Sequence, residues 1–150
     1  RLFKGRNLYV SGACLMAREM AEEKQLGDYL LLDEQMVTSQ VAVNLYAEAK
    51  QQKVALVEAG VPWYLVDEEL ELIPSGETEL ALQTKNVLTQ KEKQFMIELD
   101  PLTGRLDRHC RLMLRIRFES PSQCIVTIKD EGFGELFPTS NRIWEKQVEL

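Results

Sequence analysis

The sequence predicts a mainly β fold: an antiparallel β-sandwich of about eight short strands, preceded by one α-helix. Three observations lead to this prediction. Before residue 28 the apolar residues recur with helical spacing, whereas from residue 41 onward they alternate with period two. Turn signals rich in glycine and proline separate the alternating runs at nearly regular intervals. Short strands that each have one apolar face, joined by such turns, are typical of two sheets packed face to face.

The helix is predicted from Ala13 to about Lys24, with Ser11 as its N-cap and Gly27 as its C-terminal stop. The apolar positions that fall on one face of this helix are Ala13, Met16, Ala17, Met20 and Ala21.

The stretch Asp28-Tyr29-Leu30-Leu31-Leu32-Asp33 lies on the boundary between the helical and the alternating patterns. Three consecutive leucines fit neither period, so two interpretations stay open. One is a short apolar tether that needs another surface to cover it. The other is a first β-strand buried on both faces. We assign residues 28–40 to a leucine-rich linker with the start of the first strand, and the linker residues are Asp28, Leu30, Leu31, Leu32 and Asp33.

The strands are predicted from apolar residues that share one side of each alternating run. In the first half of the sandwich these are Val41, Val43, Leu45, Val54, Leu56, Val66, Leu70, Leu72, Leu80 and Leu82, with a polar turn at Lys50-Gln51-Gln52-Lys53. In the second half they are Phe95, Ile97, Leu99, Leu112, Leu114, Ile116, Phe118, Cys124, Val126, Ile128, Trp144, Val148 and Leu150. The run at residues 111–119 alternates most strictly, because Arg111, Arg115 and Arg117 take the opposite side.

Composition limits the classes of function. With 45% apolar and 28% charged residues the 150-residue chain is globular, and its net charge of −6 argues against nucleic acid or membrane as a partner. The chain begins at Arg1 without a signal peptide, so we expect a piece of a longer cytoplasmic protein. Cys14, Cys110 and Cys124 show no CxxC spacing, and we predict reduced thiols, although Cys110 and Cys124 could lie near each other.

The residue types that catalysis needs do not form a recognisable pattern. His109 is the single histidine and has no evident nucleophile or carboxylate partner. Asp67, Glu68, Glu69 and Glu71 could hold a hard cation, but a solvated strand face is the better interpretation. Asp130, Glu131 and Glu135 resemble a calcium loop only loosely, and a turn is preferred. We therefore predict no enzyme activity, no metal site and no cofactor in this chain.

Several motifs, taken in order, resemble the centre of the DnaK-type heat-shock chaperones. The helix start Ser11-Gly12-Ala13-Cys14 resembles the helix that closes their actin-like ATPase domain, and residues 28–33 resemble their acid-flanked leucine tether. Residues 125–134 look like the sandwich strand that ends in Lys-Asp-x-Gly-x-Gly, and residues 100–104 like an Asp-Leu-Thr-Gly turn.

A closer resemblance is to an uncharacterised bacterial family of DnaK-like proteins. Its members carry Arg-x-Phe-x-Gly-Asn-Asn-Leu-Tyr-x-x-Gly-Ala-Cys, here residues 1–14 with Arg6 in place of one Asn. They also carry a Gly-Phe-Gly-Glu-Phe-Phe-Pro-like segment, here residues 132–138. The departures from the chaperones are a first hairpin turn without glycine, at residues 47–52, and a short second covering loop around residues 74–77. A peptide would therefore be held loosely.

The resemblance implies three parts: the tail of an actin-like ATPase domain (residues 1–27), a linker (28–40) and a peptide-binding-like sandwich (41–150). It implies a chaperone-like binder of extended peptides or unfolded protein segments, which also contacts its own ATPase domain. ATP and Mg²⁺ would be bound by the parent protein only. The candidate peptide-binding residues flank the first two hairpin loops: Val43, Leu45, Ala47, Leu70, Leu72, Leu80 and Leu82. The alternative is an assembly module that docks on its own ATPase domain or on another subunit and has no peptide cleft.

Overall fold

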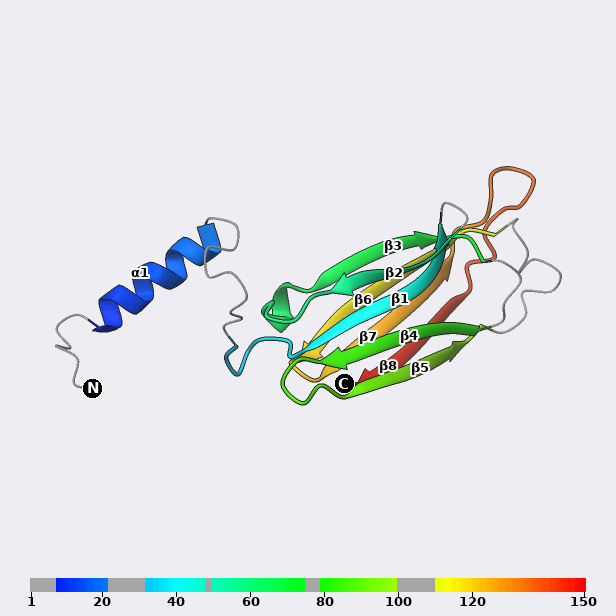
Figure 1. The fold of residues 1–150 in the computed structure, drawn as a ribbon. Helices are drawn as coiled ribbons and strands as arrows, with labels where there is room; N and C mark the ends of the chain where they lie inside the picture. Colours follow the sequence, from blue (N-terminus) through cyan, green and yellow to red (C-terminus); the bar gives the residue numbers. More distant parts are fainter. Residues whose placement is uncertain (1–7, 22–31, 48–49, 75–78, 100–109) are drawn as a thin grey trace. The chain divides into compact units, whose positions relative to one another are not determined.

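The structure is a computed structural model that describes residues 8–21, 32–47, 50–74, 79–99 and 110–150 (Figure 1). The chain divides into two compact units, residues 1–31 and residues 32–150. This division falls inside the segment assigned to the linker. Among the described residues, the first unit contributes the helix and the second contributes the strands.

The helix α1 spans Leu8–Ala21, so it begins five residues before the predicted start at Ala13. Ser11 and Gly12 lie inside the helix, and the prediction of Ser11 as the N-cap is wrong. Both residues are poor helix formers, at a cost of about 1 kcal/mol for Gly12 and about 0.5 kcal/mol for Ser11. The good helix formers that follow, among them Ala13, Leu15, Met16 and Ala17, offset this cost. Tyr9, Val10 and Leu15 are exposed on this helix.

The second unit contains eight antiparallel strands in two four-stranded sheets, which confirms the predicted fold class (Figure 1). The first sheet has the order β2-β1-β4-β5, with β1 Ser39–Ala47, β2 Lys50–Val57, β4 Glu79–Asn86 and β5 Glu92–Glu98. The second sheet has the order β3-β6-β7-β8, with β3 Asp67–Leu72, β6 Leu112–Ser120, β7 Gln123–Asp130 and β8 Ile143–Glu149. A 3₁₀-helix, η1, spans Trp63–Leu65 between β2 and β3.

The core lies between the two sheets and is built by the predicted alternation. In β6 the four apolar residues Leu112, Leu114, Ile116 and Phe118 are buried, as predicted. The neighbouring β7 buries Cys124, Val126 and Ile128 in the same way. The first sheet adds Val41, Val43, Leu82 and Ile97 to the same apolar cluster. Such alternation works because successive side chains of a strand point to opposite faces of its sheet.

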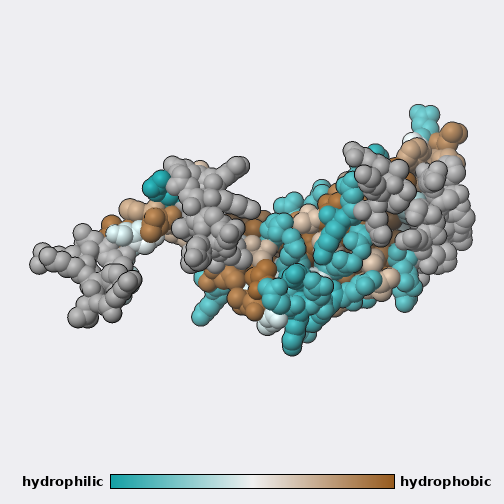
Figure 2. Space-filling view, viewed as in Figure 1, coloured by the Kyte–Doolittle hydropathy of each residue, from teal (hydrophilic) through white to brown (hydrophobic). Residues whose placement is uncertain are grey.

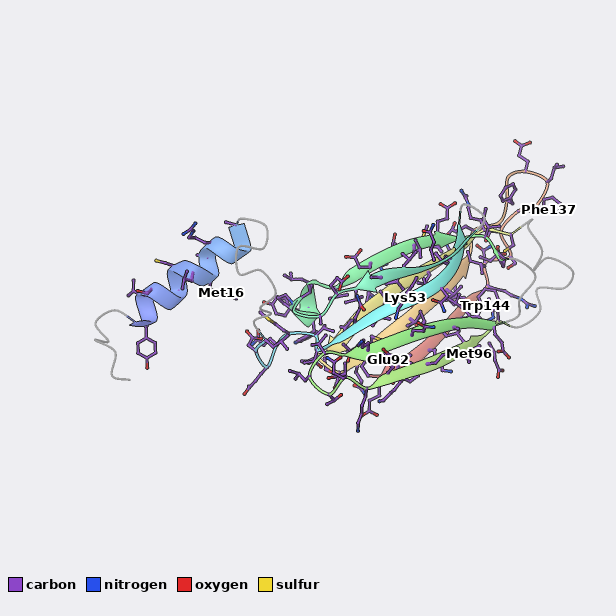
Figure 3. All side chains as sticks on the ribbon, viewed as in Figure 1. Met16, Lys53, Glu92, Met96, Phe137 and Trp144 are labelled. Carbon is purple, nitrogen blue, oxygen red and sulfur yellow. The ribbon has the colours of Figure 1, made fainter. Side chains whose placement is uncertain are left out.

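The two sheets also meet along one pair of edge strands. Lys146 on β8 donates a hydrogen bond from Nζ to the carbonyl oxygen of Met96 on β5, at 2.5 Å. Met96 and Trp144 accordingly lie on the same side of the sandwich (Figure 3). The visible outer face of the first sheet is largely hydrophilic in Figure 2.

One turn prediction is wrong. Lys50-Gln51-Gln52-Lys53 does not form the first hairpin turn, because it is the beginning of strand β2 and Ala47 pairs with Lys50. The strand β2 lies at the edge of its sheet, where polar side chains remain in contact with water. Polarity alone therefore gave a misleading turn signal at this edge.

The antiparallel pairing places the loops at two opposite ends of the sandwich. The chain enters β1 at one end, which also holds η1 and the β4–β5 and β6–β7 turns. The other end, which we call the loop end, holds the β1–β2, β3–β4, β5–β6 and β7–β8 connections. Phe137 lies there, beyond the ends of the strands (Figure 3).

The expectation that Cys110 and Cys124 could lie near each other is wrong. Cys124 pairs with Phe118 at the start of β7, whereas Cys110 contacts Asp130 at the end of β7. Six residues of extended strand separate these two positions by about 20 Å, far beyond the reach of a disulfide. Cys14, Cys110 and Cys124 form no disulfide with one another.

Candidate functional site

Asp130, the last residue of β7, organises the loop that connects β7 to β8. Asp130 is only 2% exposed. Oδ1 accepts hydrogen bonds from the backbone N–H of Gly132, at 2.9 Å, and from Cys110 Sγ, at 3.1 Å. Oδ2 accepts from the backbone N–H of Ser140 at 2.8 Å, and the Asp130 carbonyl accepts from the Thr139 hydroxyl. One carboxylate therefore ties both sides of the loop to the end of the strand.

These contacts also set the charge of Asp130. Burial raises the pKa of a carboxyl group, but here the hydrogen bonds from Ser140, Cys110 and Gly132 outweigh burial and lower the pKa of Asp130 from 3.8 to about 2. Asp130 is therefore ionised at neutral pH, although it is buried. Both of its carboxylate oxygens accept hydrogen bonds from the loop, so this side chain acts as a structural anchor.

Gly132 lets the loop fold back on itself. Its φ is +68°, and a Cβ at this position would lie 2.5 Å from the Phe137 carbonyl oxygen. Phe133 donates its backbone N–H to that same carbonyl at 2.7 Å. Only glycine accommodates both the positive φ and the close approach of the returning backbone. The short bridge between Phe133 and Phe137 results from this fold.

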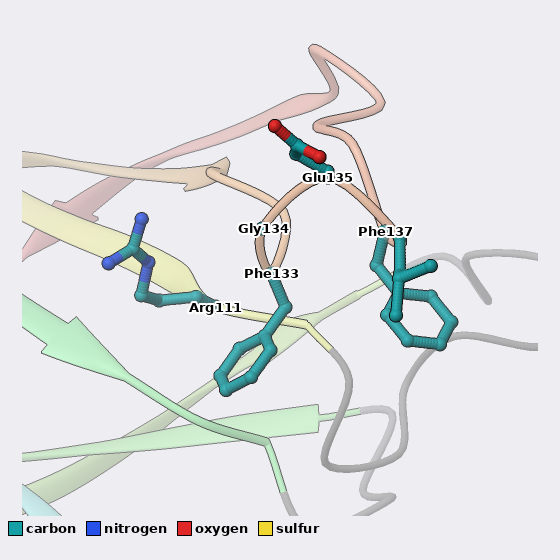
Figure 4. Close-up of a pocket in the computed structure, with 6 residues that line it drawn as sticks. Arg111, Phe133, Gly134, Glu135 and Phe137 are labelled. Carbon is teal, nitrogen blue, oxygen red and sulfur yellow. The ribbon is translucent and has the colours of Figure 1, made fainter.

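The folded loop forms one wall of an open groove of about 630 Å³ at the loop end of the sandwich (Figure 4). The groove is lined by Arg111, Phe133, Gly134, Glu135, Leu136 and Phe137. Phe133 is 46% exposed and Leu136 is 87% exposed, while Phe137 is half-buried. Hydrophobic residues are visible at the tip of this loop in Figure 2. Apolar side chains gathered on a loop tip are typical of a protein-binding surface.

Arg111 brings an unusual hydrogen-bond donor to this groove. Its Nη1 donates to Glu71 Oε1 on β3, at 3.3 Å. Its Nε is shielded from solvent and has no acceptor among the described residues. A shielded donor on a cationic group is costly to leave unpaired, so an acceptor supplied by a ligand would be stabilised there.

The cations at and beside the groove are paired with carboxylates. Glu71 is paired with Arg111, Glu135 lines the groove, and Glu131 pairs with Lys129 at 2.7 Å. The positive charge of Arg111 is thus offset locally, and the groove favours neutral or basic ligands over acidic ones.

The seven predicted peptide-binding residues occupy three kinds of environment. Val43, Leu72 and Leu82 belong to the buried core. Leu45, Leu70 and Leu80 are half-buried and pack against the core in the halves of their strands nearest the loop end. The side chain of Ala47 lies outside the described residues. The peptide-binding role of all seven stays a prediction.

Two of the five predicted linker residues are described. Leu32 is half-buried and Asp33 is exposed. Asp33 caps a turn, because its Oδ1 accepts the backbone N–H of Gln35 at 2.8 Å and its carbonyl accepts that of Met36. Asp28, Leu30 and Leu31 lie outside the described residues, as does His109.

The acidic face of β3 is neutralised by the arginines of β6. Asp67 accepts hydrogen bonds from Arg115, at 2.6 and 2.5 Å, and Glu69 lies 3.5 Å from the same guanidinium. The hydrogen bond from Arg115, together with the positive charges of Arg115 and Arg117, lowers the pKa of Asp67. Within the described ranges, no three His, Cys, Asp or Glu side chains lie close enough together to hold a metal ion.

Sequence reasoning alone missed the groove. Phe133, Leu136 and Phe137 interrupt a turn rich in glycine and acids, and no period brings them together. The signal that could have found them is their hydrophobicity inside a turn, where polar residues normally predominate. Arg111 was predicted to point outward, and it does, but its relation to the loop depends on the register between β6 and β7.

Comparison with known proteins places the sandwich in one family. No curated protein matches the chain. The described part of the chain also holds no helix that could cross a membrane. A family model described as "Domain of unknown function (DUF8552)" matches residues 36–150, which include every strand of the sandwich. The chain therefore belongs to the family described as Domain of unknown function (DUF8552).

Proposed function

We propose that this chain is a chaperone-like module that binds extended peptides or unfolded segments of proteins. The proposal places it in the cytoplasm as the C-terminal part of a DnaK-like ATPase. ATP and Mg²⁺ would be bound upstream in the parent protein, and the sandwich itself would perform no catalysis.

One observation carries the proposal: exposed apolar side chains gather around an open groove at the loop end of a sandwich with a closed core. Phe133 and Leu136 contribute nothing to that core, so their exposure is unfavourable unless a ligand covers them. Strand β1 begins at the opposite end of the sandwich, so the groove and the start of β1 lie at different ends. The resemblance of residues 28–33 and 125–134 to the chaperones supports the same proposal.

A direct binding measurement tests the proposal. A short fluorescein-labelled peptide of leucines and lysines is titrated with the 150-residue chain, and fluorescence anisotropy reports binding. We expect saturable binding that an excess of unlabelled peptide reverses. The chain should also slow the aggregation of a reduced, unfolded protein, measured by light scattering. An anisotropy that stays constant up to high protein concentration would overturn the proposed function.

A different surface favours the alternative function. In this alternative the chain is an assembly module that docks permanently on its ATPase domain or on another subunit. Tyr64 and Leu65 of η1 are exposed at the end of the sandwich where the chain enters β1. The Trp63 and Tyr64 rings contact each other edge to face. Replacing Tyr64 and Leu65 by serine in the parent protein tests this alternative. Loss of the contact between the sandwich and the rest of the protein, with peptide binding unchanged, would show a docking role for η1.

A further inference from the structure

We infer that the groove of the β7–β8 loop, rather than the pair of hairpin loops beside Leu45, Leu70 and Leu80, holds the peptide, and that Arg111 Nε donates to a peptide backbone carbonyl. The inference rests on the proposed function and assigns its site. It identifies the occupant as an extended apolar segment that is neutral or basic.

The apolar lining determines which part of the peptide enters. Phe133 and Phe137 project from the same loop, and Leu136 stands between them in the sequence (Figure 4). Two aromatic rings and a leucine around an open groove fit the side chain of a leucine or a larger aliphatic residue. By contrast, Val43 and Leu82 are sealed in the core and offer nothing to a ligand.

The unpaired donor determines how the peptide is held. Arg111 Nε is shielded and lacks an acceptor among the described residues, while Nη1 is already engaged with Glu71. An extended peptide presents a carbonyl oxygen at every residue, so it can supply an acceptor wherever its apolar side chain enters. A carbonyl oxygen that accepts from Nε would add no charge to the groove.

The charges around the groove disfavour an acidic peptide as the ligand. Arg111 is paired with Glu71 and Lys129 with Glu131, so the negative charge that these pairs leave in the lining of the groove is that of Glu135. The whole chain also carries a net charge of −6. A peptide carboxylate would therefore meet repulsion from Glu135. Lysine or arginine beside the apolar residues of the peptide would instead be attracted to Glu135.

Two pairs of variants test the site with the fluorescein-labelled leucine–lysine peptide. Leu136→Ser removes an apolar side chain from the groove, and its control is Leu88→Ser. Leu88 is also exposed, at 66%, but lies in the β4–β5 turn at the opposite end of the sandwich. Arg111→Met removes the donor and keeps an apolar stem. Its control, Arg115→Met, removes a guanidinium that is paired with Asp67 and lies outside the lining of the groove.

The inference predicts that Leu136→Ser and Arg111→Met each raise the Kd for the peptide about tenfold. The two controls should change it by less than about twofold. A peptide in which glutamates replace the lysines should bind more weakly than the leucine–lysine peptide. Circular dichroism checks that every variant keeps its strands; Leu136 is exposed, so its substitution leaves the fold intact.

The outcomes separate the inference from the proposed function. If the unaltered chain binds the peptide and neither groove variant weakens binding, the peptide is held elsewhere and only the inference is overturned. If the unaltered chain binds no peptide, both are overturned. Sedimentation velocity tests whether a second copy of the chain, rather than a peptide, occupies the groove. A dimer that Leu136→Ser converts to a monomer would show that it does, and would also overturn the inference.

Discussion

Asp130 and Ser140 are joined by a hydrogen bond of 2.8 Å from the Ser140 backbone N–H to Asp130 Oδ2, across a loop of nine intervening residues. The other oxygen of the same carboxylate accepts from Gly132 and Cys110. A single buried side chain thus fixes the start of the loop, its end and the chain that enters β6. The geometry of the candidate groove depends on this anchor, because Phe133, Leu136 and Phe137 all lie between Gly132 and Ser140.

Replacing Asp130 by asparagine should destabilise the sandwich by about 1–3 kcal/mol. The amide nitrogen cannot accept the Ser140 or Gly132 N–H, and one buried backbone donor is left without a partner. The free energy of unfolding from urea titrations measures the effect. Asp67→Asn is the matched control, because its ion pair with Arg115 is exposed and such pairs contribute little. An equal loss in both variants would contradict the role of Asp130 as an anchor.

Stability should fall in acid in a way that depends on Asp130. The pKa of Asp130 is about 2 in the folded chain, below its ordinary value of 3.8, so ionised Asp130 stabilises the fold above pH 3.8. This contribution, on the order of 2 kcal/mol, is lost progressively as pH falls from about 5 to about 2. The difference in unfolding free energy between the unaltered chain and Asp130→Asn should therefore shrink in that range. A difference that stays constant from pH 6 to about pH 2 would contradict the prediction.

Gly132→Ala should be much more destabilising than Gly134→Ala. Both glycines have a positive φ, +68° and +69°, so both variants carry the conformational cost of about 1 kcal/mol. At Gly132 the new Cβ would also lie 2.5 Å from both the Phe137 carbonyl oxygen and the Thr139 nitrogen, whereas no described atom lies within 4 Å at Gly134. We expect a total loss of about 2–4 kcal/mol for Gly132→Ala. Equal midpoints in urea would show that the loop does not return as closely as described.

The sequence predicted the sandwich because alternation is a local signal. Leu112, Leu114, Ile116 and Phe118 are separated by single residues, and burying them requires only that the strand has one inner face. The strand order could not be predicted in this way, since β3 pairs with β6 across forty residues. The same limit applied to the groove. Arg111 and Phe133 come from different segments, and they meet only once β6 and β7 are in register and Asp130 has closed the loop.

Turns and helix ends were predicted less well, for a physical reason. Lys50 and Lys53 are as polar in an edge strand as they would be in a turn, and Ser11 is tolerated inside a helix that its neighbours favour. Asp130 shows the opposite case. Its sequence context, between a strand and two glycines, correctly indicated a turn. However, its burial and its several hydrogen bonds follow from residues up to twenty positions away.

The three thiols should react with iodoacetamide at very different rates. Cys14 is exposed on α1, while Cys110 and Cys124 are buried. Burial raises the pKa of Cys124 to about 11, so its thiolate is scarce at neutral pH as well as inaccessible. Mass spectrometry of the folded chain should therefore find carbamidomethylation at Cys14 first, and urea should make all three thiols reactive. Because Cys110 donates to Asp130, the Asp130→Asn variant should speed labelling of Cys110 before that of Cys124. Labelling of Cys124 as fast as Cys14 in the folded chain would contradict its place in the core.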